Sequence, residues 1–394
     1  MESLLNKQRI LNIMQANGVD VLMATIPENV LYASGFRSLS QWLIRGRKTP
    51  VVVVLNSNGD LTLVAPAGEL DRAACDPPAV DRIIAFDTVT IEPGHEAIWL
   101  PEDRRYAEIA LRAGRPVDLW EALARLDLQN ASCVAIDDPD LAAAYREYYN
   151  AKVIDGRPLW QESRLIKTPA ELARLRRAVE ITEHALQHAM AAVRVGMSER
   201  ELAAIFEAAL LEAGHFAQPY LTVIGGGTFG AYPNHVPGDY RIKAGDLIRW
   251  DVGCEYKGYV ADIARTACVG EPNELQSRRW EAVLAGQLAA LDAIQPGVAA
   301  SEIYRIGMDA ARHAGLPEIK RKHIGHGIGI DMYEPPSISP HETLTLQPGM
   351  VFELEVLFYE FGFGSTQVED TIHITPDGYE CFTTLPHELF IVGD

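Results

Sequence analysis

The chain has 394 residues, of which 48% are hydrophobic, and its formal net charge is -19 at pH 7. This length and composition suit two or more domains with sizeable cores. The acidic balance argues against nucleic acid and anionic membrane surfaces as partners, because both repel a negatively charged protein. The five cysteines form no CxxC pair, and the longest dense apolar run covers only residues 51–55. We therefore expect a cytoplasmic protein with reduced thiols and no membrane span.

Helical and strand patterns alternate over the first 160 residues. Apolar residues at helical spacing predict a helix over 4–16, followed by a strand over 19–24. The turn segment Asn56-Ser-Asn-Gly59 separates two apolar runs, which indicates a hairpin. Further strands are expected over 82–86 and 133–136, and helices over 103–113 and 119–124. This mixture predicts an α/β N-terminal domain.

A second pattern begins near residue 160, which divides the chain into expected domains 1–160 and 161–394. After this point a threonine cap, a proline and a glutamate predict the start of a long helix, and a serine cap predicts another. From residue 222 onward strands and glycine-rich turns dominate, so we expect an α+β domain. Its predicted helices span 169–194, 198–213, 276–294 and 301–314.

Asp251 and Asp262 lie on the two strands of a predicted hairpin. A turn at residues 256–257 would place the two aspartates directly opposite each other, and a turn at 257–258 would make the pair diagonal. Both registers keep the carboxylates on one face. Because two such charges repel, one must be protonated or a cation must lie between them. Two unrelated surface acids would explain this pair almost as well.

Glu355 and Glu369 lie at equal distances from Gly362 along a second predicted hairpin. With an odd-length loop the two glutamates would face each other. A glutamate within so apolar a strand is costly to bury without a partner. Glu353 shares a face with Glu355, so spacing alone leaves open which of them is a metal ligand.

Three histidines lie in or near glycine-rich segments. His326 stands between two glycines and follows His323 by three residues, within HIGHGIGIDMYEPP. His235 lies in a loop after a run of three glycines, which is not a dinucleotide fingerprint because no GxGxxG opens a helix there. A single histidine is usually structural, but the glycine-framed His326 is a better candidate for a metal ligand.

The order Asp, Asp, His, Glu, Glu in these contexts resembles the pita-bread metallohydrolases. This family includes Xaa-Pro dipeptidases (prolidases), aminopeptidases P, methionine aminopeptidases and creatinase. The similar segments are WDVGCEYKGYVADIART, HIGHGIGIDMYEPP, LQPGMVFELE and QVEDTIHIT, with looser similarity in SRLIKTPAELARLRRA and ENVLYASGF. The resemblance implies a creatinase-like α/β N-terminal domain and an α+β pita-bread catalytic domain.

The resemblance also implies roles for individual side chains. Glu355 is preferred to Glu353 as a ligand because it follows GMVF at the spacing that the family shows, and it is the expected proton shuttle. His235 is an expected catalytic and substrate-binding residue, and His323 and Tyr333 are expected to bind substrate. Such an oxygen-rich site suits two divalent ions, manganese first, with cobalt, iron or zinc as alternatives, that activate water. The expected metal ligands are Asp251, Asp262, His326, Glu355 and Glu369.

Three positions depart from the prolidase pattern. Tyr333 replaces a histidine, and a phenol cannot act as an imidazole near neutral pH. Gln367 replaces an arginine and removes a fixed positive charge, and Val356 replaces a frequent proline. Three functions therefore stay open: a dinuclear-metal hydrolase of small peptides resembling Xaa-Pro dipeptidase, a creatinase-like hydrolase of small-molecule amides or amidines, and a catalytically silent binding protein.

Arg37, Trp42, Arg45 and Arg47 form a basic, aromatic stretch in an otherwise acidic chain. In related dimeric enzymes the N-terminal domain can reach the active site of the partner. We therefore hypothesise a homodimer in which Trp42 or Arg45 closes the pocket and binds a substrate carboxylate. A solvated loop with one packed tryptophan explains the same residues.

Overall fold

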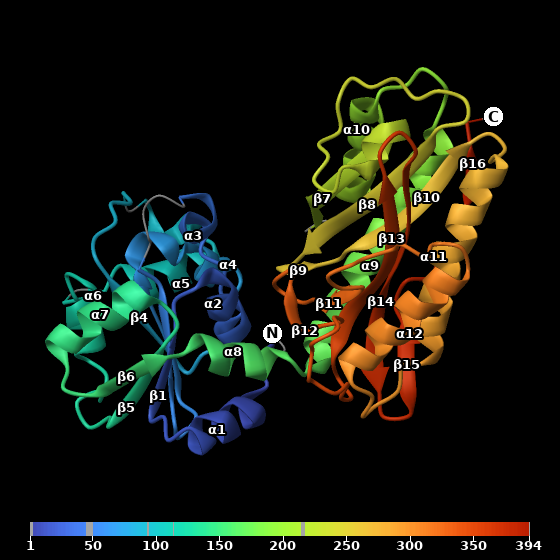
Figure 1. Cartoon of the computed structure of the whole chain (residues 1–394). Coiled ribbons are helices and arrows are strands. Elements are labelled where there is room, and N and C mark those ends of the chain that lie inside the picture. Colours follow the sequence, from blue (N-terminus) through green and yellow to red (C-terminus); the bar gives the residue numbers. More distant parts are fainter. Residues whose placement is uncertain (1–2, 45–49, 93, 113, 214–216, 394) are drawn as a thin grey trace. The chain divides into compact units, whose positions relative to one another are not determined.

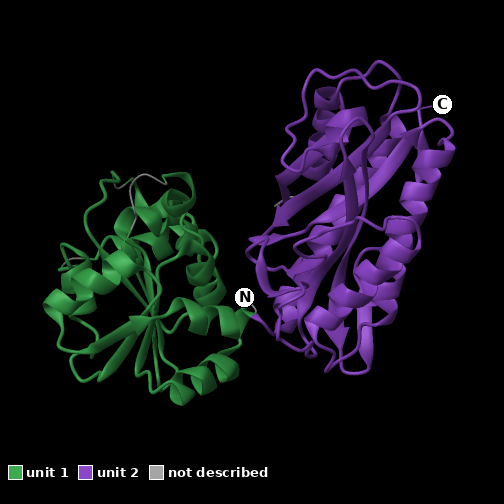
Figure 2. Ribbon diagram, in the orientation of Figure 1, with its two compact units in different colours: residues 1–164 green, residues 165–394 purple. Residues whose placement is uncertain are grey.

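The computed structural model of the chain describes residues 3–44, 50–92, 94–112, 114–213 and 217–393. It divides into two compact units, Met1–Arg164 and Leu165–Asp394 (Figure 2). Arg45 and Arg47 lie outside the described residues. None of the helices that the structure describes is long and apolar enough to cross a membrane.

Unit 1 is built on a six-stranded mixed sheet in the order β4-β3-β2-β1-β5-β6 (Figure 1). Neighbouring strands are antiparallel from β1 to β3 and parallel elsewhere. Every residue of β1 and β5 is buried, as expected where helices cover both faces of a sheet. The strands are β1 Val21–Ala24, β2 Val52–Asn56, β3 Leu61–Pro66, β4 Arg82–Phe86, β5 Cys133–Ile136 and β6 Lys152–Asp155.

Eight α-helices are described in unit 1, and the sequence patterns predicted only some of them. The expected helix over 103–113 begins and ends earlier, as α5. The patterns missed α2 because six consecutive residues of this short helix are buried, which leaves no amphipathic period to detect. The helices are α1 Lys7–Ala16, α2 Pro27–Ser34, α3 Leu39–Leu43, α4 Asp71–Cys75, α5 Pro101–Ala110, α6 Leu119–Leu123, α7 Pro139–Tyr148 and α8 Arg157–Arg164.

Unit 2 contains a ten-stranded sheet with the main order β12-β11-β13-β14-β10-β8-β7. Three short strands add to it, β15 on β14, β16 on β10 and β9 on β8. The strands are β7 Ala217–Gly226, β8 Leu247–Tyr256, β9 Tyr259–Val260, β10 Ile263–Val269, β11 Gly325–Gly327, β12 Glu334–Ser337, β13 Val351–Glu360, β14 Gly364–Thr375, β15 Gly378–Cys381 and β16 Phe390–Val392.

Four long helices pack on this sheet, and all four were predicted from the sequence within a few residues. α9 packs against β8 and α10 against β7, while α11 packs against β13 and β14 with α12 beside it. Thr168 and Glu171 form the expected reciprocal capping box at the start of α9. The helices are α9 Pro169–Ala192, α10 Glu199–Ala213, α11 Glu274–Asp292 and α12 Ala300–His313.

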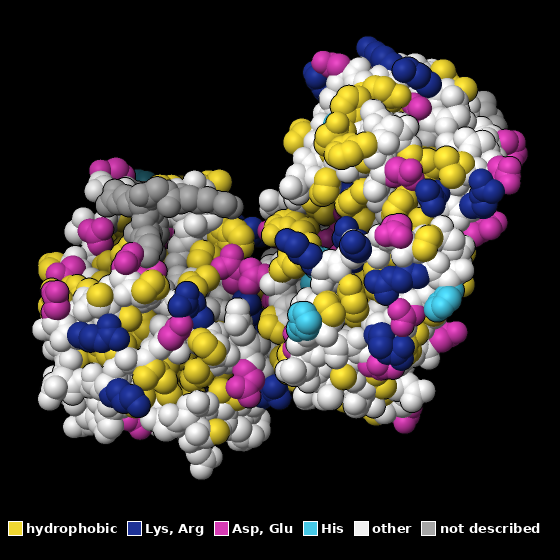
Figure 3. Space-filling model, in the orientation of Figure 1, with side chains coloured by type: hydrophobic (Ala, Val, Ile, Leu, Met, Phe, Trp, Pro, Cys, Tyr) yellow, Lys and Arg dark blue, Asp and Glu magenta, His cyan; other side chains and the backbone are white. Residues whose placement is uncertain are grey.

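Basic, acidic and apolar side chains are interspersed on the face of each unit that Figure 3 shows. The buried core of unit 2 joins α11 and α12 to the strands β13 and β14. The long central strands are therefore rigidly supported, and the acidic side chains they carry have well-defined positions.

Candidate metal centre

The hairpin of β8 and β10 sets the positions of the two aspartates. Tyr256 faces Tyr259 across a two-residue turn, and Asp251 faces Ala264. Both turn residues have positive φ, 51° at Lys257 and 87° at Gly258, as a type I′ turn requires. Of the two registers left open by the sequence, the structure adopts the one in which Asp251 and Asp262 are diagonal.

The hairpin of β13 and β14 places Glu355 directly opposite Glu369, as their spacing about Gly362 predicted. Glu353 faces Thr371 instead, whose hydroxyl donates a hydrogen bond to Glu353 Oε1 over 3.0 Å. Glu353 is fully buried, and its pKa is raised mainly by burial.

A single row of residues crosses the two hairpins. Ala264 on β10 pairs with Glu369 on β14, so Asp251, Ala264, Glu369 and Glu355 lie side by side on four successive strands. Directly paired residues project from the same face of a sheet. β11 extends this arrangement beyond β13, because His326 pairs with Glu353. All five expected ligands therefore face one side of the sheet.

One group of side chains on this face of the sheet combines two carboxylates with one imidazole. Single ligand atoms of Asp262, His326 and Glu369 all lie within 4.8 Å of one another. His326 Nδ1 lies 3.2 Å from the carbonyl oxygen of Gly327, and Nε2 lies 3.9 Å from Asp262 Oδ2. The backbone contact on one nitrogen directs the other toward the carboxylates, which is the usual arrangement of a metal-binding histidine.

Without a cation, the buried carboxylates of this group lie unfavourably close to one another. Burial, followed by the neighbouring carboxylates, raises the pKa of Asp262 and of Glu369 well above the ordinary range. Burial also raises the pKa of Asp251 to about 6, although Arg249 opposes the shift. Asp262 Oδ1 is buried and has no hydrogen-bond partner in the described part of the chain. Divalent cations fit this donor set, since they would neutralise the carboxylates and satisfy the orphaned oxygen.

His323 and Tyr333 border the carboxylates. His323 Nδ1 lies 3.2 Å from Glu355 Oε1. The phenol ring of Tyr333 stacks on His326 with centroids 3.9 Å apart and meets His323 edge to face at 6.0 Å. The structure thus brings both expected substrate-binding residues to the cluster.

His235 is held by a residue that the sequence analysis missed. His235 Nε2 lies 2.7 Å from Glu199 Oε2, and the fully buried Glu199 carboxylate also accepts bonds from the amides of Gly226 and Gly238. Phe229 stacks on the imidazole with centroids 5.2 Å apart. The sequence showed only that Glu199 follows Ser198, the predicted N-cap of α10.

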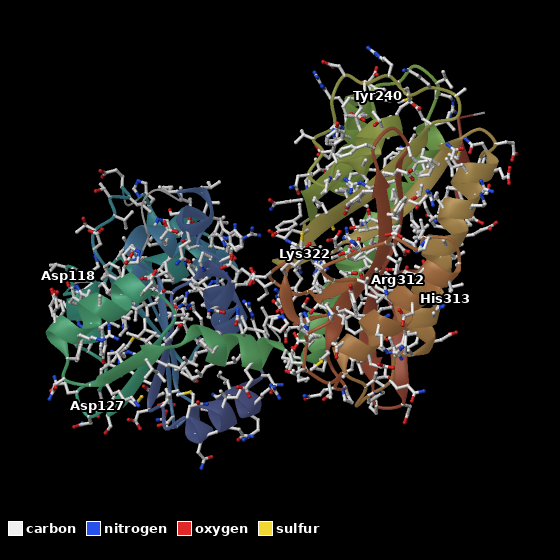
Figure 4. The ribbon with its side chains drawn as sticks, viewed as in Figure 1. Asp118, Asp127, Tyr240, Arg312, His313 and Lys322 are labelled. Atoms are coloured by element: carbon white, nitrogen blue, oxygen red, sulfur yellow. The ribbon has the colours of Figure 1, made fainter. Side chains whose placement is uncertain are left out.

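Tyr240 packs edge-on against the same Phe229, with centroids 5.2 Å apart. It lies at the α10 end of unit 2, whereas Lys322 marks the segment that leads into β11 (Figure 4). His235 and His323 therefore belong to different segments of unit 2.

Arg249 is the second residue that the sequence analysis missed. Its side chain is fully buried, and Nη1 lies 3.6 Å from Asp251 Oδ2. Gln367 directs its uncharged amide nitrogen Nε2 toward Asp251 Oδ2 at 3.4 Å and Glu369 Oε2 at 3.5 Å. The positive charge beside Asp251 comes instead from the guanidinium of Arg249. The alternation of β8 could have revealed it, since residues 249 and 251 share a face.

Comparison with known proteins assigns both units. Residues 173–376 match the model of metallopeptidase family M24, and residues 7–166 match the Creatinase/Prolidase N-terminal domain. The Xaa-Pro dipeptidase of Pyrococcus horikoshii is 34% identical over 229 residues, which cover 58% of this chain and 65% of the relative, just under two thirds of its length. The Xaa-Pro dipeptidase of Lactobacillus helveticus is 30% identical over 285 residues, covering 70% of this chain and 77% of the relative.

Solved structures agree over nearly the whole chain. Prolidase from Pyrococcus furiosus has a TM-score of 0.76 and 26% identity, covering 95% of this chain and 99% of that one. Xaa-Pro dipeptidase from Bacillus anthracis has a TM-score of 0.79, covers 98% of both chains and, at 23% identity, supports the fold. These matches confirm the predicted creatinase-like and pita-bread folds. The chain belongs to metallopeptidase family M24, a family whose members use divalent metal ions.

Proposed function

We propose that this chain is a dipeptidase that hydrolyses the amide bond preceding proline and that it works with two manganese ions. The row that joins Asp251, Glu369 and Glu355 across four strands is the observation that carries the proposal. The names of its relatives, Xaa-Pro dipeptidases, support the substrate class and favour a peptide over a creatine-like amidine.

Four carboxylates and one imidazole would hold the metals, and this oxygen-rich set suits manganese. The proposed ligands are Asp251, Asp262, His326, Glu355 and Glu369. Bound divalent ions supply Lewis acidity, which polarises a carbonyl and lowers the pKa of water.

Glu355 is the proposed proton shuttle. His323 Nδ1 lies 3.2 Å from Glu355 Oε1 and would help to orient this carboxylate. Glu355 would take a proton from the attacking water and pass it to the nitrogen of the leaving proline. Its neighbour Tyr333 would form an apolar wall against the substrate.

His235 is proposed to bind the carbonyl oxygen of the scissile amide. Because Nε2 is engaged by Glu199, Nδ1 is the nitrogen left to donate a hydrogen bond to that oxygen. Donors aimed at the oxygen on which charge develops stabilise the transition state. The Phe229 ring on the imidazole restricts its rotation.

Metal content and a substrate panel test this function. We expect protein reloaded with Mn²⁺ after chelation to hold about two ions by elemental analysis. It should cleave Ala-Pro and Gly-Pro faster than Ala-Ala, and leave creatine intact. Absence of bound metal would contradict the ligand assignment, and faster turnover of creatine or of Ala-Ala would contradict the Xaa-Pro specificity.

We also propose a cytoplasmic homodimer, with domains that separate near residue 160. The described cysteines are all free, which suits a reducing compartment. Trp42 lies under the guanidinium of Arg37, with 4.6 Å from Cζ to the ring centroid, and stays a candidate for closing the pocket. Light scattering of the purified protein would test the dimer, and expression of residues 161–394 alone would test the boundary.

A further inference from the structure

Arg249 contacts three different parts of unit 2 through one guanidinium group. Nη1 lies 3.6 Å from Asp251 Oδ2 and donates a hydrogen bond to the hydroxyl of Tyr359 over 2.5 Å. Nη2 donates to the carbonyl oxygens of Tyr232 and Pro233 over 2.8 and 3.0 Å. A guanidinium is planar and rigid, so these contacts are fixed relative to one another.

The guanidinium of Arg249 lies on the face of the sheet that carries the proposed metal ligands. A fully buried cation needs a compensating anion, and Asp251 is two residues away on the same face of β8. Another buried arginine, Arg265, projects from the opposite face of the neighbouring strand and pairs with Asp370 over 2.8 Å. Each face of the sheet thus has its own buried arginine and carboxylate, with separate partners.

The second set of contacts fixes the loop that carries His235. Tyr232 and Pro233 lie three and two residues before this histidine, and their carbonyl oxygens accept both Nη2 bonds. Glu199 contacts the imidazole itself, with Oε2 2.7 Å from His235 Nε2. Arg249 therefore connects the backbone of the His235 loop to the carboxylate of Asp251.

We propose that Arg249 is a positioning residue with two tasks. It supplies beside Asp251 the positive charge that Gln367 lacks, and it sets the distance between the metal centre and the His235 loop. The inference rests on the proposed metal-dependent function. It adds the residue that connects the metal centre to the His235 loop. Gln367 assists by offering its amide to Asp251 and Glu369.

Moving the charge from one position to the other separates the two tasks. We expect Arg249→Gln to weaken Mn²⁺ binding about 10–100-fold in titration calorimetry, as loss of an outer partner of a ligand usually does. Adding Gln367→Arg to that variant should restore most of the Mn²⁺ affinity. The kcat for Ala-Pro should stay low at saturating Mn²⁺, because position 367 does not replace the bonds to residues 232 and 233.

Arg249→Lys offers a conservative comparison. It keeps the charge but not the planar fork, so Mn²⁺ affinity should stay near that of the wild type while kcat falls. Arg279→Gln is the matched control, since Arg279 is a partly buried arginine that faces Glu360 and Phe358. This control should leave both Mn²⁺ affinity and kcat unchanged.

Several outcomes would overturn the role of Arg249. Unchanged Mn²⁺ affinity in folded Arg249→Gln would do so, as would failure of the double variant to regain affinity or full recovery of its kcat. If Arg249→Gln does not fold, the single variant Gln367→Arg tests the role of Arg249. This variant places two arginines beside Asp251, so we expect weaker Mn²⁺ binding. Tighter Mn²⁺ binding would contradict the proposal. A wild type that neither binds Mn²⁺ nor cleaves Ala-Pro would instead contradict the proposed function.

Discussion

The phenol ring of Tyr333 lies over the imidazole of His326, with centroids 3.9 Å apart and an interplanar angle of 24°. The tyrosine is 63% exposed, whereas His326 is buried. One face of the phenol thus covers a proposed metal ligand while the rest stays accessible. This arrangement makes the ring a wall of the site and suggests contact with substrate through its apolar surface.

Replacing this wall should affect substrate binding more than turnover. We expect Tyr333→Ala to raise the KM for Ala-Pro up to about tenfold, because an aromatic contact contributes about 0.5–1.5 kcal/mol. Tyr333→Phe keeps the ring and should behave like the wild type. Steady-state kinetics on both variants measures this, and equal losses in the two would show that the hydroxyl, not the ring, is required.

Removing one carboxylate should have opposite effects on thermal stability with and without metal. In the presence of a chelator, the Asp262→Asn substitution relieves repulsion from Asp251 and Glu355. The melting temperature of this variant should therefore exceed that of the wild type. With Mn²⁺ at about 100 times the wild-type Kd, the wild type should gain about 2.7 kcal/mol and the variant much less. Differential scanning calorimetry in both conditions tests this crossing, and a variant stabilised by Mn²⁺ as strongly as the wild type contradicts the ligand role.

Glu199 should influence catalysis through His235 and not through the metals. We expect Glu199→Gln to lower kcat about 100-fold or less, because the imidazole loses the carboxylate that fixes its orientation. Mn²⁺ affinity measured by calorimetry should be unchanged, which separates this variant from Arg249→Gln. If His235→Ala lowers kcat by a similar factor, and the double variant lowers kcat no further, Glu199 acts through His235. Additive losses of kcat in the double variant would contradict this role.

Glu171 should make stability depend on pH. Burial is the main cause that raises its pKa to about 7. The folded state therefore keeps a proton that the unfolded chain releases near pH 4. The stabilisation is complete below that pH and is lost as the pH rises toward 7, with a total of about 3 kcal/mol.

Urea unfolding at several pH values tests this expectation. Glu171→Gln cannot ionise, so its free energy of unfolding should change less between pH 4.5 and 7 than that of the wild type. Glu180→Gln is the control, because Glu180 is a half-exposed glutamate of the same helix α9, paired with Arg177. If the free energy of unfolding of Glu171→Gln changed with pH as steeply as that of the wild type, other groups would be responsible for the pH dependence.

Local features were predictable because neighbouring residues alone determine them. The capping box of α9 depends on residues three apart, and the facing of Glu355 and Glu369 follows from a three-residue loop centred on Gly362. Turn chemistry at Lys257 and Gly258 likewise decides between two registers that both keep the aspartates together. The resemblance then singled out Glu355 over Glu353.

The sequence by itself thus determined the two folds, the family and an ordered set of ligand candidates. Only the tertiary structure decided that β10 pairs with β14, which brings the two acidic hairpins into one row. It also decided that Arg249 meets Asp251, Tyr359 and the His235 loop, and that Glu199 meets His235. These contacts join residues between 16 and 110 positions apart, or lie on one face of a single strand. Local patterns do not encode which remote segments meet, because that depends on packing of the whole sheet and its helices.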